Sequence, residues 1–323
     1  MLEQKSWKEY LLPYLPERIA DAVGGMDERV PLEEIRIRAA RPLQLCFSGF
    51  ERMIYAPGGR PMAEEKDLSQ IVARLCGHSM YAWESEMSGG FITLGGGCRV
   101  GICGRCVQEG ERLHHAEDVT SVNFRIARER FGAASALLPR IRDAGNRLLP
   151  TLIVSAPGCG KTTMLRDIAR QCSDGLCGMR PHRVAIVDTR YELAGCVRGA
   201  PHFSVGARTD VRTGGVRAEG IRQMVLTMSP EIIVTDELSC TEDAYAVLDA
   251  VSAGVTVAAS AHAGSLASLQ KRPPLLGLLH EGVFSRYVLL DRSRGVGTVR
   301  AVFDENGREI GEVGQKWQRL LRC

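Results

Sequence analysis

The sequence predicts an α/β protein of two modules, a mixed α+β module followed by a domain built on a mostly parallel sheet. The chain has 323 residues, a length typical of two domains. Residues up to about 145 mix strand-like alternation with short helical stretches, and after the polar, turn-rich segment 142–146 strands and helices alternate. We therefore expect domains at 1–145 and 146–323.

The first module is expected to contain short helices and half-buried strands. Pro13 and Pro16 divide the helical pattern of its first segment into short pieces. Alternation of apolar and polar residues predicts strands, and the glycines at 95–97 predict a turn between two of them. The expected helices are 7–23, 68–76, a further one ending at Met87, and 133–143; the expected strands are 32–38, 43–47, 51–55, 90–94, 98–103 and 121–127.

The second module opens with a phosphate-binding turn. An apolar strand, LIV at 152–154, breaks into SAPGCGKTT, which is a P-loop: strand, glycine-rich loop and helix start. The loop's N–H groups and the helix dipole favour phosphate, the lysine reaches the β- and γ-phosphates, and the first threonine binds Mg²⁺. The expected nucleotide-binding residues are Ser155, Pro157, Gly158, Cys159, Gly160, Lys161, Thr162 and Thr163.

Ser155 departs from the P-loop pattern, in which the first position is glycine. A residue with a Cβ fits there only if its φ is negative, and Pro157 already stiffens the turn. The backbone of Ser155 is therefore the point on which phosphate binding depends.

Acidic residues follow two further apolar strands of this module. The run 183–188 ends in Asp188, with Glu192 four residues later, and the run 231–237 ends in Asp236 and Glu237. The second is a Walker B pattern, in which the first acid holds Mg²⁺ through water and the second orients and deprotonates the attacking water. A catalytic glutamate one strand removed from the P-loop strand leaves room for that water.

A histidine and several arginines complete the set of candidates. The strand 255–260 is followed by His262, which can touch the γ-phosphate or its water. Arginines can neutralise transition-state charge on a phosphoryl group, although arginine is common in this chain and any one can equally be a solvated surface group. The candidates lie in a glycine-rich segment that we expect to be a loop until a helix begins near Glu219. They are Arg208, Arg212, Arg217 and Arg222.

Composition excludes several classes of protein. The net charge of +3 is nearly balanced, which gives no electrostatic case for nucleic acid or an anionic membrane. The polar start and the eleven scattered cysteines predict reduced thiols in a cytoplasm, and no run is long and apolar enough for a spanning helix. The spacing of Cys98, Cys103 and Cys106 is also that of some [2Fe–2S] sites, but the intervening residues favour a strand with buried thiols.

Together these segments resemble the stage III sporulation protein AA family, which is similar to the secretion and pilus ATPases of type II and type IV systems. The resemblance covers nearly the whole chain. In the first module it rests on EEIRIRAARPL, SMYAWESEM, GGCRVGICG and SVNFRIARE, and in the second on SAPGCGKTT, IVDTRYELAG, GARTDVRTG, RAEGIRQMVLTMSPEIIVTDE and SAHA. Ser155, and Ser239 after Asp-Glu-Leu, stand where the family usually has glycine.

The resemblance implies a RecA-like ATPase core that assembles as a ring, by the family pattern a hexamer, and uses ATP and Mg²⁺. By the same pattern Asp188 and Glu192 form an acidic box, His262 a histidine box, and Arg125 and Arg128 are presented towards nucleotide. The implied role is to energise a channel or secretion-like complex of membrane proteins around the developing forespore. The implied location is peripheral to that membrane on the cytoplasmic, mother-cell side.

Three alternative functions remain at this stage. A DNA-translocating motor can have the same RecA-type core. The balanced charge and the lack of basic patches interleaved with aromatic residues argue against a nucleic-acid partner. A GTP switch would need an Asn-Lys-x-Asp guanine reader, which the sequence lacks. A nucleotide-binding scaffold without turnover is conceivable because of Ser155, but the lysine and the Asp-Glu pair favour hydrolysis.

Overall fold

The computed structural model describes residues 6–27, 30, 32–47, 49–77, 91–109, 112–126, 129–196, 199–269 and 271–310, with the side chains of 106–109 and 112–117 left out. The chain forms two compact units, Met1–Arg128 with Val197–His202, and Glu129–Cys196 with Phe203–Cys323. Segment 129–145, which the sequence analysis placed in the first module, therefore packs with the second unit. The helix expected to end at Met87 lies outside the described residues.

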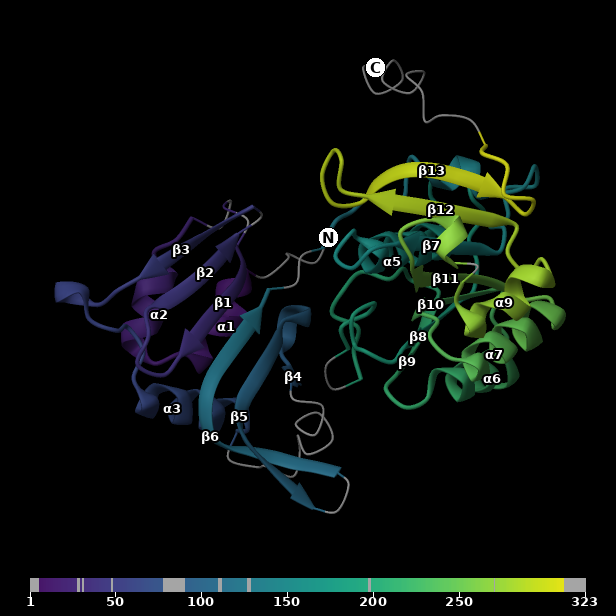
Figure 1. Cartoon of the computed structure of the whole chain (residues 1–323). Helices are drawn as coiled ribbons and strands as arrows, with labels where there is room; N and C mark the ends of the chain where they lie inside the picture. Colours follow the sequence, from purple (N-terminus) through teal and green to yellow (C-terminus); the bar gives the residue numbers. More distant parts are fainter. Residues whose placement is uncertain are drawn as a thin grey trace. The chain divides into compact units, whose positions relative to one another are not determined.

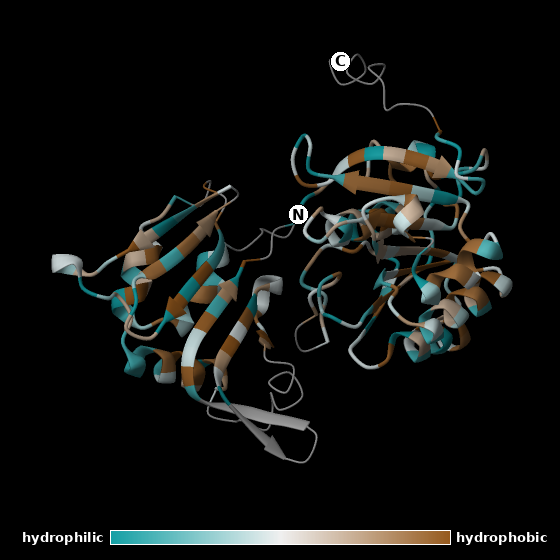
Figure 2. Ribbon diagram, viewed as in Figure 1, coloured by the Kyte–Doolittle hydropathy of each residue, from teal (hydrophilic) through white to brown (hydrophobic). Residues whose placement is uncertain are grey.

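The first unit is built on an antiparallel sheet with the order β3-β2-β1-β6-β5-β4 (Figure 1). Period-2 sequences put alternate side chains on opposite faces, and Figure 2 shows this as teal and brown bands along β1 and β2. The strands are β1 (Leu32–Arg38), β2 (Leu43–Phe47), β3 (Phe50–Ile54), β4 (Phe91–Thr93), β5 (Arg99–Glu109) and β6 (Arg112–Arg125).

Short helices cover the apolar face of this sheet. The first begins with a capping box, in which Ser6 Oγ accepts from Lys8 N and Glu9 Oε1 accepts from Ser6 N. Helix and strand side chains such as Leu68, Ile35 and Phe124 share one buried core. The helices are α1 (Trp7–Leu11), α2 (Glu17–Gly24) and α3 (Glu65–Leu75), with 3₁₀ turns η1 (Leu12–Tyr14), η2 (Pro57–Gly59) and η4 (Gly95–Gly97).

The second unit has a sheet with the order β13-β12-β7-β11-β10-β8-β9, parallel except for the β12–β13 hairpin. Its central strands are apolar on both faces, as parallel sheets require, and Figure 2 shows β12 as a mostly brown strand. The strands are β7 (Thr151–Ser155), β8 (Val184–Asp188), β9 (Thr209–Thr213), β10 (Ile232–Glu237), β11 (Thr256–His262), β12 (Arg286–Asp291) and β13 (Thr298–Asp304).

Helices pack on both faces of the parallel sheet and give two separate cores. One core joins the P-loop helix α5 to side chains such as Ile153 and Val234, and the other joins α6, α7 and α9 to side chains such as Val154 and Ile233. The mostly parallel α/β fold predicted from the sequence is thus confirmed. The helices are α5 (Lys161–Asp174), α6 (Arg217–Met228), α7 (Thr241–Ser252), α8 (Leu266–Leu269) and α9 (Pro273–His280).

Two local predictions for this unit were wrong. The helix expected at 133–143 is a series of turns with one 3₁₀ turn, η5 (Leu138–Arg140), because Pro139 stands inside it and has no N–H to donate to Ser135 O. The N–H groups of Gly132 and Ala134 donate to the buried carboxylate of Asp167. The glycine-rich segment before Glu219, which was expected to be a loop, contains the edge strand β9, and this strand pairs in parallel with β8.

The core of the first unit provides a test of its packing. Phe124 is fully buried on β6, and Phe50 on the edge strand β3 is 57% exposed. We expect Phe124→Ala to lower the free energy of unfolding of this unit by about 3–5 kcal/mol through lost burial and cavity formation. Phe50→Ala should cost less than about 1 kcal/mol. Urea unfolding followed by circular dichroism compares the two, and equal losses would contradict this assignment of the core.

Candidate functional site

The P-loop lies between the buried strand β7 and the helix α5. Gly158 (φ +69°) and Gly160 (φ +90°) both adopt left-handed backbone conformations that favour glycine. A Cβ on Gly158 would collide with the guanidinium of Arg292, and one on Gly160 would come within 3.1 Å of Gly297. The two glycines therefore allow the left-handed turn and also let the loop between β12 and β13 approach closely. The N–H of Gly297 in that loop donates to Cys159 O.

Ser155 takes the place of the expected glycine without backbone strain. It is the last residue of β7, fully buried, and it is absent from the described residues with positive φ. A side chain is therefore tolerated, and its hydroxyl donates to Ala156 O. The departure from the P-loop pattern changes what surrounds the lysine and leaves the path of the loop intact.

The ammonium of Lys161 is held inside the loop by several acceptors. Its Nζ lies 3.1 Å from Ser155 O, 3.3 Å from Ser155 Oγ, 3.2 Å from Ala156 O and 2.8 Å from His262 Nδ1. Burial lowers the pKa of Lys161, and the nearby charge of Glu237 opposes that shift. The lysine is thus pre-positioned at the mouth of the P-loop.

A line of side chains connects this lysine to Glu237. His262 Nε2 lies 2.9 Å from Glu237 Oε2, and the same oxygen lies 3.1 Å from Arg190 Nη1. Because an ammonium can only donate, His262 Nδ1 must accept from Lys161, and Nε2 then carries the hydrogen that points to Glu237. The carboxyl ends of β7, β11 and β10 are neighbours in the sheet, which is why three residues distant in sequence meet.

The acidic-box residues occupy a different position. Asp188 is fully buried, and its two oxygens accept from Glu192 N at 2.8 Å and Ala194 N at 2.9 Å. Arg166 on α5 donates to the carbonyls of Glu192 and Leu193. Asp188 thus fixes the loop after β8, and the negative charge of Glu192 acts on the pKa of Lys161 only at longer range.

Asp236 belongs to a buried ion cluster against α6 and α7. Arg217 Nε lies 3.1 Å from Asp236 Oδ1, its Nη1 2.9 Å from Asp243 Oδ2, and its Nη2 2.9 Å from Thr189 Oγ1. Successive side chains of a strand point to opposite faces, so Asp236 and its neighbour Glu237 meet different partners. The β10–β11 pairing also shifts register between Val234 and Glu237. Asp236 Oδ2 is buried and has no hydrogen-bond partner among the described residues.

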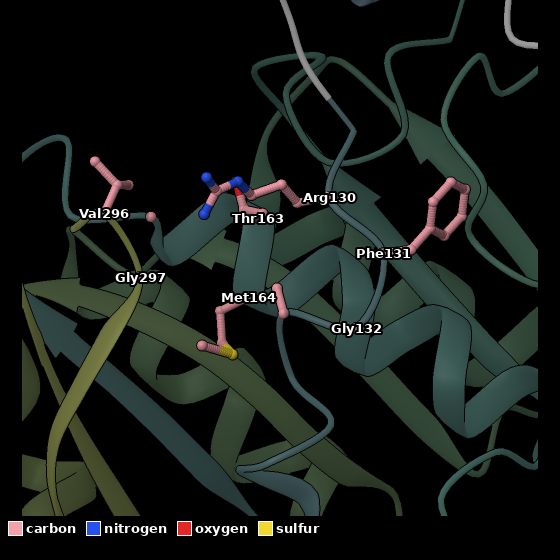
Figure 3. A pocket seen from close by; sticks show the side chains of 9 residues that line it. Arg130, Phe131, Gly132, Thr163, Met164, Val296 and Gly297 are labelled. Carbon is pink, nitrogen blue, oxygen red and sulfur yellow. The ribbon is translucent and has the colours of Figure 1, made fainter. Parts of the chain in front are cut away.

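A pocket of about 380 Å³ lies beside the P-loop within the second unit. Three segments line it: the start of α5, the stretch 130–133 and the β12–β13 connection (Figure 3). Figure 3 shows Arg130 and Thr163 with Val296 and Gly297 on its wall. Of the predicted nucleotide-binding residues, Gly160 and Thr163 face this pocket, and Thr162 beside them is the partly buried second residue of α5.

The arginines selected from the sequence are held by other partners. Arg208 donates to Ser173 O, Arg212 to Gln223 and Gly214 O, Arg222 pairs with Asp249, and Arg125 pairs with Glu34 in the first unit. Arg128 lies outside the described residues. The arginines found at the P-loop and the Glu237 line are Arg190, Arg272, which donates to His262 O, and Arg292, which donates to Gly158 O.

Sequence reasoning missed these three arginines because the residue type is too common here to stand out. A positional signal was available for Arg190, which comes two residues after the acid that ends β8, at the edge of the sheet where ligands bind. Arg272 and Arg292 follow later elements whose contacts with the P-loop only the fold reveals. Of the cysteines with iron–sulfur spacing, Cys98 is buried, Cys103 is exposed and the side chain of Cys106 is not described.

Comparison with known proteins adds the family to this geometry. The family model described as "Sporulation stage III, protein AA" matches residues 19–310. The chain belongs to this family. Stage III sporulation protein AA of Bacillus subtilis (strain 168) is 42% identical over 301 residues, covering 93% of this chain and 96% of that protein. An uncharacterized protein ycf45 of Cyanidium caldarium is 31% identical over 50% of this chain and 46% of its own length.

Solved structures similar to this family member are ATPases of secretion and pilus systems. The ATPase DotB of Legionella pneumophila has a TM-score of 0.54 at 15% identity, covering 80% of this chain and 72% of its own. The pilus retraction motor PilT with bound ADP has a TM-score of 0.56 at 12% identity, covering 86% and 77%. At these identities the likeness establishes the fold, which agrees with the predicted RecA-like P-loop core. Within the described residues, no helix has the length and hydrophobicity of a membrane span.

The buried cluster of Arg217 gives a test of its role in stability. Arg217→Met would leave Asp236 and Asp243 buried without their cation, so we expect a loss of about 3–5 kcal/mol in the free energy of unfolding. Arg222→Met, whose partly exposed arginine pairs with the exposed Asp249, is the matched control and should change it by about 0.5 kcal/mol or less.

The pH dependence of that loss distinguishes electrostatics from packing. Burial raises the pKa of Asp236 even with Arg217 beside it, and removing the arginine raises it further. A carboxyl with a raised folded pKa binds its proton more tightly in the folded state, so stability falls as the pH rises above the unfolded pKa through the folded one. The variant should therefore lose least in acid and most at neutral pH. A loss independent of pH in urea titrations would point to packing alone.

Proposed function

We propose that this protein is an Mg²⁺-dependent ATP hydrolase. The observation that carries the proposal is the hydrogen-bonded line from Lys161 through His262 to Glu237, which starts inside a P-loop and ends on a carboxylate. A P-loop lysine and a carboxylate at that separation are the two groups that hydrolysis of a phosphoanhydride requires, one for the γ-phosphate and one for the water. The fold shared with DotB and PilT supports the same class of reaction.

The residues divide the reaction between them. Lys161 would exchange the carbonyls of Ser155 and Ala156 for the β- and γ-phosphates, which are stronger acceptors. Glu237 would take a proton from a water that attacks the γ-phosphorus, while the bond to the bridging oxygen breaks and ADP leaves. His262, bonded to both groups, would register whether the γ-phosphate is present. Asp188 would support this site by fixing the loop after β8, which places Glu192 beside it.

The residues present also fit a magnesium ion. The buried Oδ2 of Asp236 has no hydrogen-bond partner among the described residues, so it can accept from a metal-bound water, and Thr162 offers a hydroxyl at the start of α5. Thr162 and Asp236 would therefore hold the ion. Magnesium supplies charge neutralisation on the β- and γ-oxygens when bound. Arg217 would keep one oxygen of Asp236 in place meanwhile.

The pocket beside the P-loop fits the nucleoside part of the substrate. It adjoins Gly160 and Thr163, which follow the phosphate cradle, and its wall carries apolar side chains such as Met164 and Val296. Apolar walls with few polar groups are typical of sites that hold a flat base. The loop between β12 and β13 would close over the phosphates through Arg292.

The biological role is proposed from the family. A relative named Stage III sporulation protein AA covers nearly the whole chain, which supports a role in sporulation. The fold of a pilus retraction motor supports mechanical use of the nucleotide cycle within a ring of identical subunits, proposed as a hexamer. Such a ring would act from the cytoplasmic, mother-cell side on protein partners of a membrane complex at the forespore.

Glu237→Gln tests the proposed chemistry. The amide keeps the shape of the side chain and cannot accept the proton, so we expect Mg-ATP to bind while hydrolysis falls by about 10²–10⁴-fold. Glu242→Gln, an exposed glutamate in the first turn of α7, is the matched control and should hydrolyse ATP at the wild-type rate. Phosphate release and calorimetry measure the two properties. Undiminished turnover in Glu237→Gln would remove Glu237 from the mechanism.

The proposed assembly is tested by mass in solution. We expect light scattering with Mg²⁺ and a non-hydrolysable ATP analogue to give a closed oligomer of the 35.3 kDa chain, and a smaller species without nucleotide. A single monomeric mass under both conditions would contradict a ring formed by the chain alone.

A further inference from the structure

One arginine of the site is paired with the proposed catalytic base. Arg190 comes two residues after the end of β8, and its Nη1 lies 3.1 Å from Glu237 Oε2, the same oxygen that His262 Nε2 approaches to 2.9 Å. The side chain of Arg190 is 53% exposed, whereas that of Glu237 is only 12% exposed. The guanidinium thus sits on the solvent side of the carboxylate, two hydrogen-bonded side chains away from Lys161.

This pairing occupies the Glu237 oxygen that faces His262 and Arg190. Glu237 Oε2 accepts from both a guanidinium and an imidazole, and these two bonds use its two lone-pair sites. For Oε2 to accept from the attacking water, the pair with Arg190 must separate. It is suited to separation, because a half-exposed ion pair is only weakly stabilising.

A γ-phosphate is the natural competitor for this guanidinium. The planar fork of arginine donates two parallel hydrogen bonds to phosphate oxygens, and a phosphate carries more charge than one carboxylate. Three other arginines lie near the P-loop: Arg272 donates to His262 O, Arg292 donates to Gly158 O, and Arg130 lines the neighbouring pocket. Arg217 is buried between two aspartates. Arg190 differs from these four because its guanidinium is paired with the proposed catalytic carboxylate.

We propose that Arg190 moves from Glu237 to the γ-phosphate when a nucleoside triphosphate binds, contacting its oxygens from within the same chain. The move neutralises charge on the transferred group and frees Glu237 Oε2 for the attacking water. The inference rests on the proposed function and extends it, because it makes the site distinguish triphosphate from diphosphate. With ADP, the guanidinium stays on Glu237.

Nucleotide binding by two Arg190 variants tests this exchange. Calorimetry measures the affinity for a non-hydrolysable ATP analogue and for ADP, each with Mg²⁺, in the wild type, Arg190→Ala and Arg190→Lys. We expect Arg190→Ala to weaken the analogue about tenfold and to leave ADP unchanged, the effect of one lost charge-assisted contact. Single-turnover hydrolysis should fall by about 10³-fold. Arg190→Lys should recover part of both losses.

Arg180→Ala is the matched control for these measurements. Arg180 is a similarly exposed arginine of the same unit, with a side chain 55% exposed and an ion pair of 2.7 Å to Glu231, away from the P-loop. This variant should bind and hydrolyse like the wild type. Its melting temperature shows how much stability is lost when an exposed, ion-paired arginine is removed, and the melting temperature of Arg190→Ala is compared with it.

Two results would overturn the inference and leave the proposed function standing. An Arg190→Ala variant with a wild-type ratio of analogue to ADP affinity would show that the arginine does not contact the γ-phosphate. Faster hydrolysis in that variant would show that Arg190 only restrains Glu237. A wild-type chain that binds neither nucleotide would instead overturn the proposed function itself, and this inference with it.

Discussion

The candidate site depends on the hydrogen-bonded line that joins Lys161, His262, Glu237 and Arg190. These residues come from four segments, and they meet because three adjacent parallel strands end at one edge of the sheet and the loop after β8 reaches across it. In a parallel sheet the carboxyl ends of all strands lie on the same side. The order of strands therefore decides which side chains meet, since a different order would separate the lysine from the carboxylate.

The loops that carry these groups are held by buried polar contacts. Asp188 and Arg166 fix the segment after β8 from its two sides, through backbone N–H groups and carbonyls respectively. Asp167 does the same for the turn that lines the pocket. Burying a charged side chain is costly unless hydrogen bonds compensate for the lost water. Here each buried charge is hydrogen-bonded to backbone groups of a segment that is neither helix nor strand. The acids that follow strands therefore differ in what they contact: Asp188 binds backbone N–H groups, and Glu237 contacts His262 and Arg190.

Ser155 illustrates how a departure from a motif can be absorbed. Because the backbone at this position remains in the strand, no left-handed conformation is needed, and the side chain can be accommodated. Its hydroxyl joins the acceptors that surround Lys161. The left-handed backbone conformations of the loop occur instead at Gly158 and Gly160, where glycine adopts them without strain.

The sequence by itself predicted the glycine-rich turn after β7, the strands that follow it, and Lys161, Glu237 and His262 as candidate residues at the ends of these elements, because such features follow from local period and spacing along the chain. It also determined the family. Only the tertiary structure decided that Asp188 is a buried residue that fixes the loop after β8 and that Asp236 pairs with Arg217. The choice among the arginines was likewise beyond the sequence. Which carboxylate a guanidinium meets depends on contacts between segments far apart in the chain, and no local pattern encodes those.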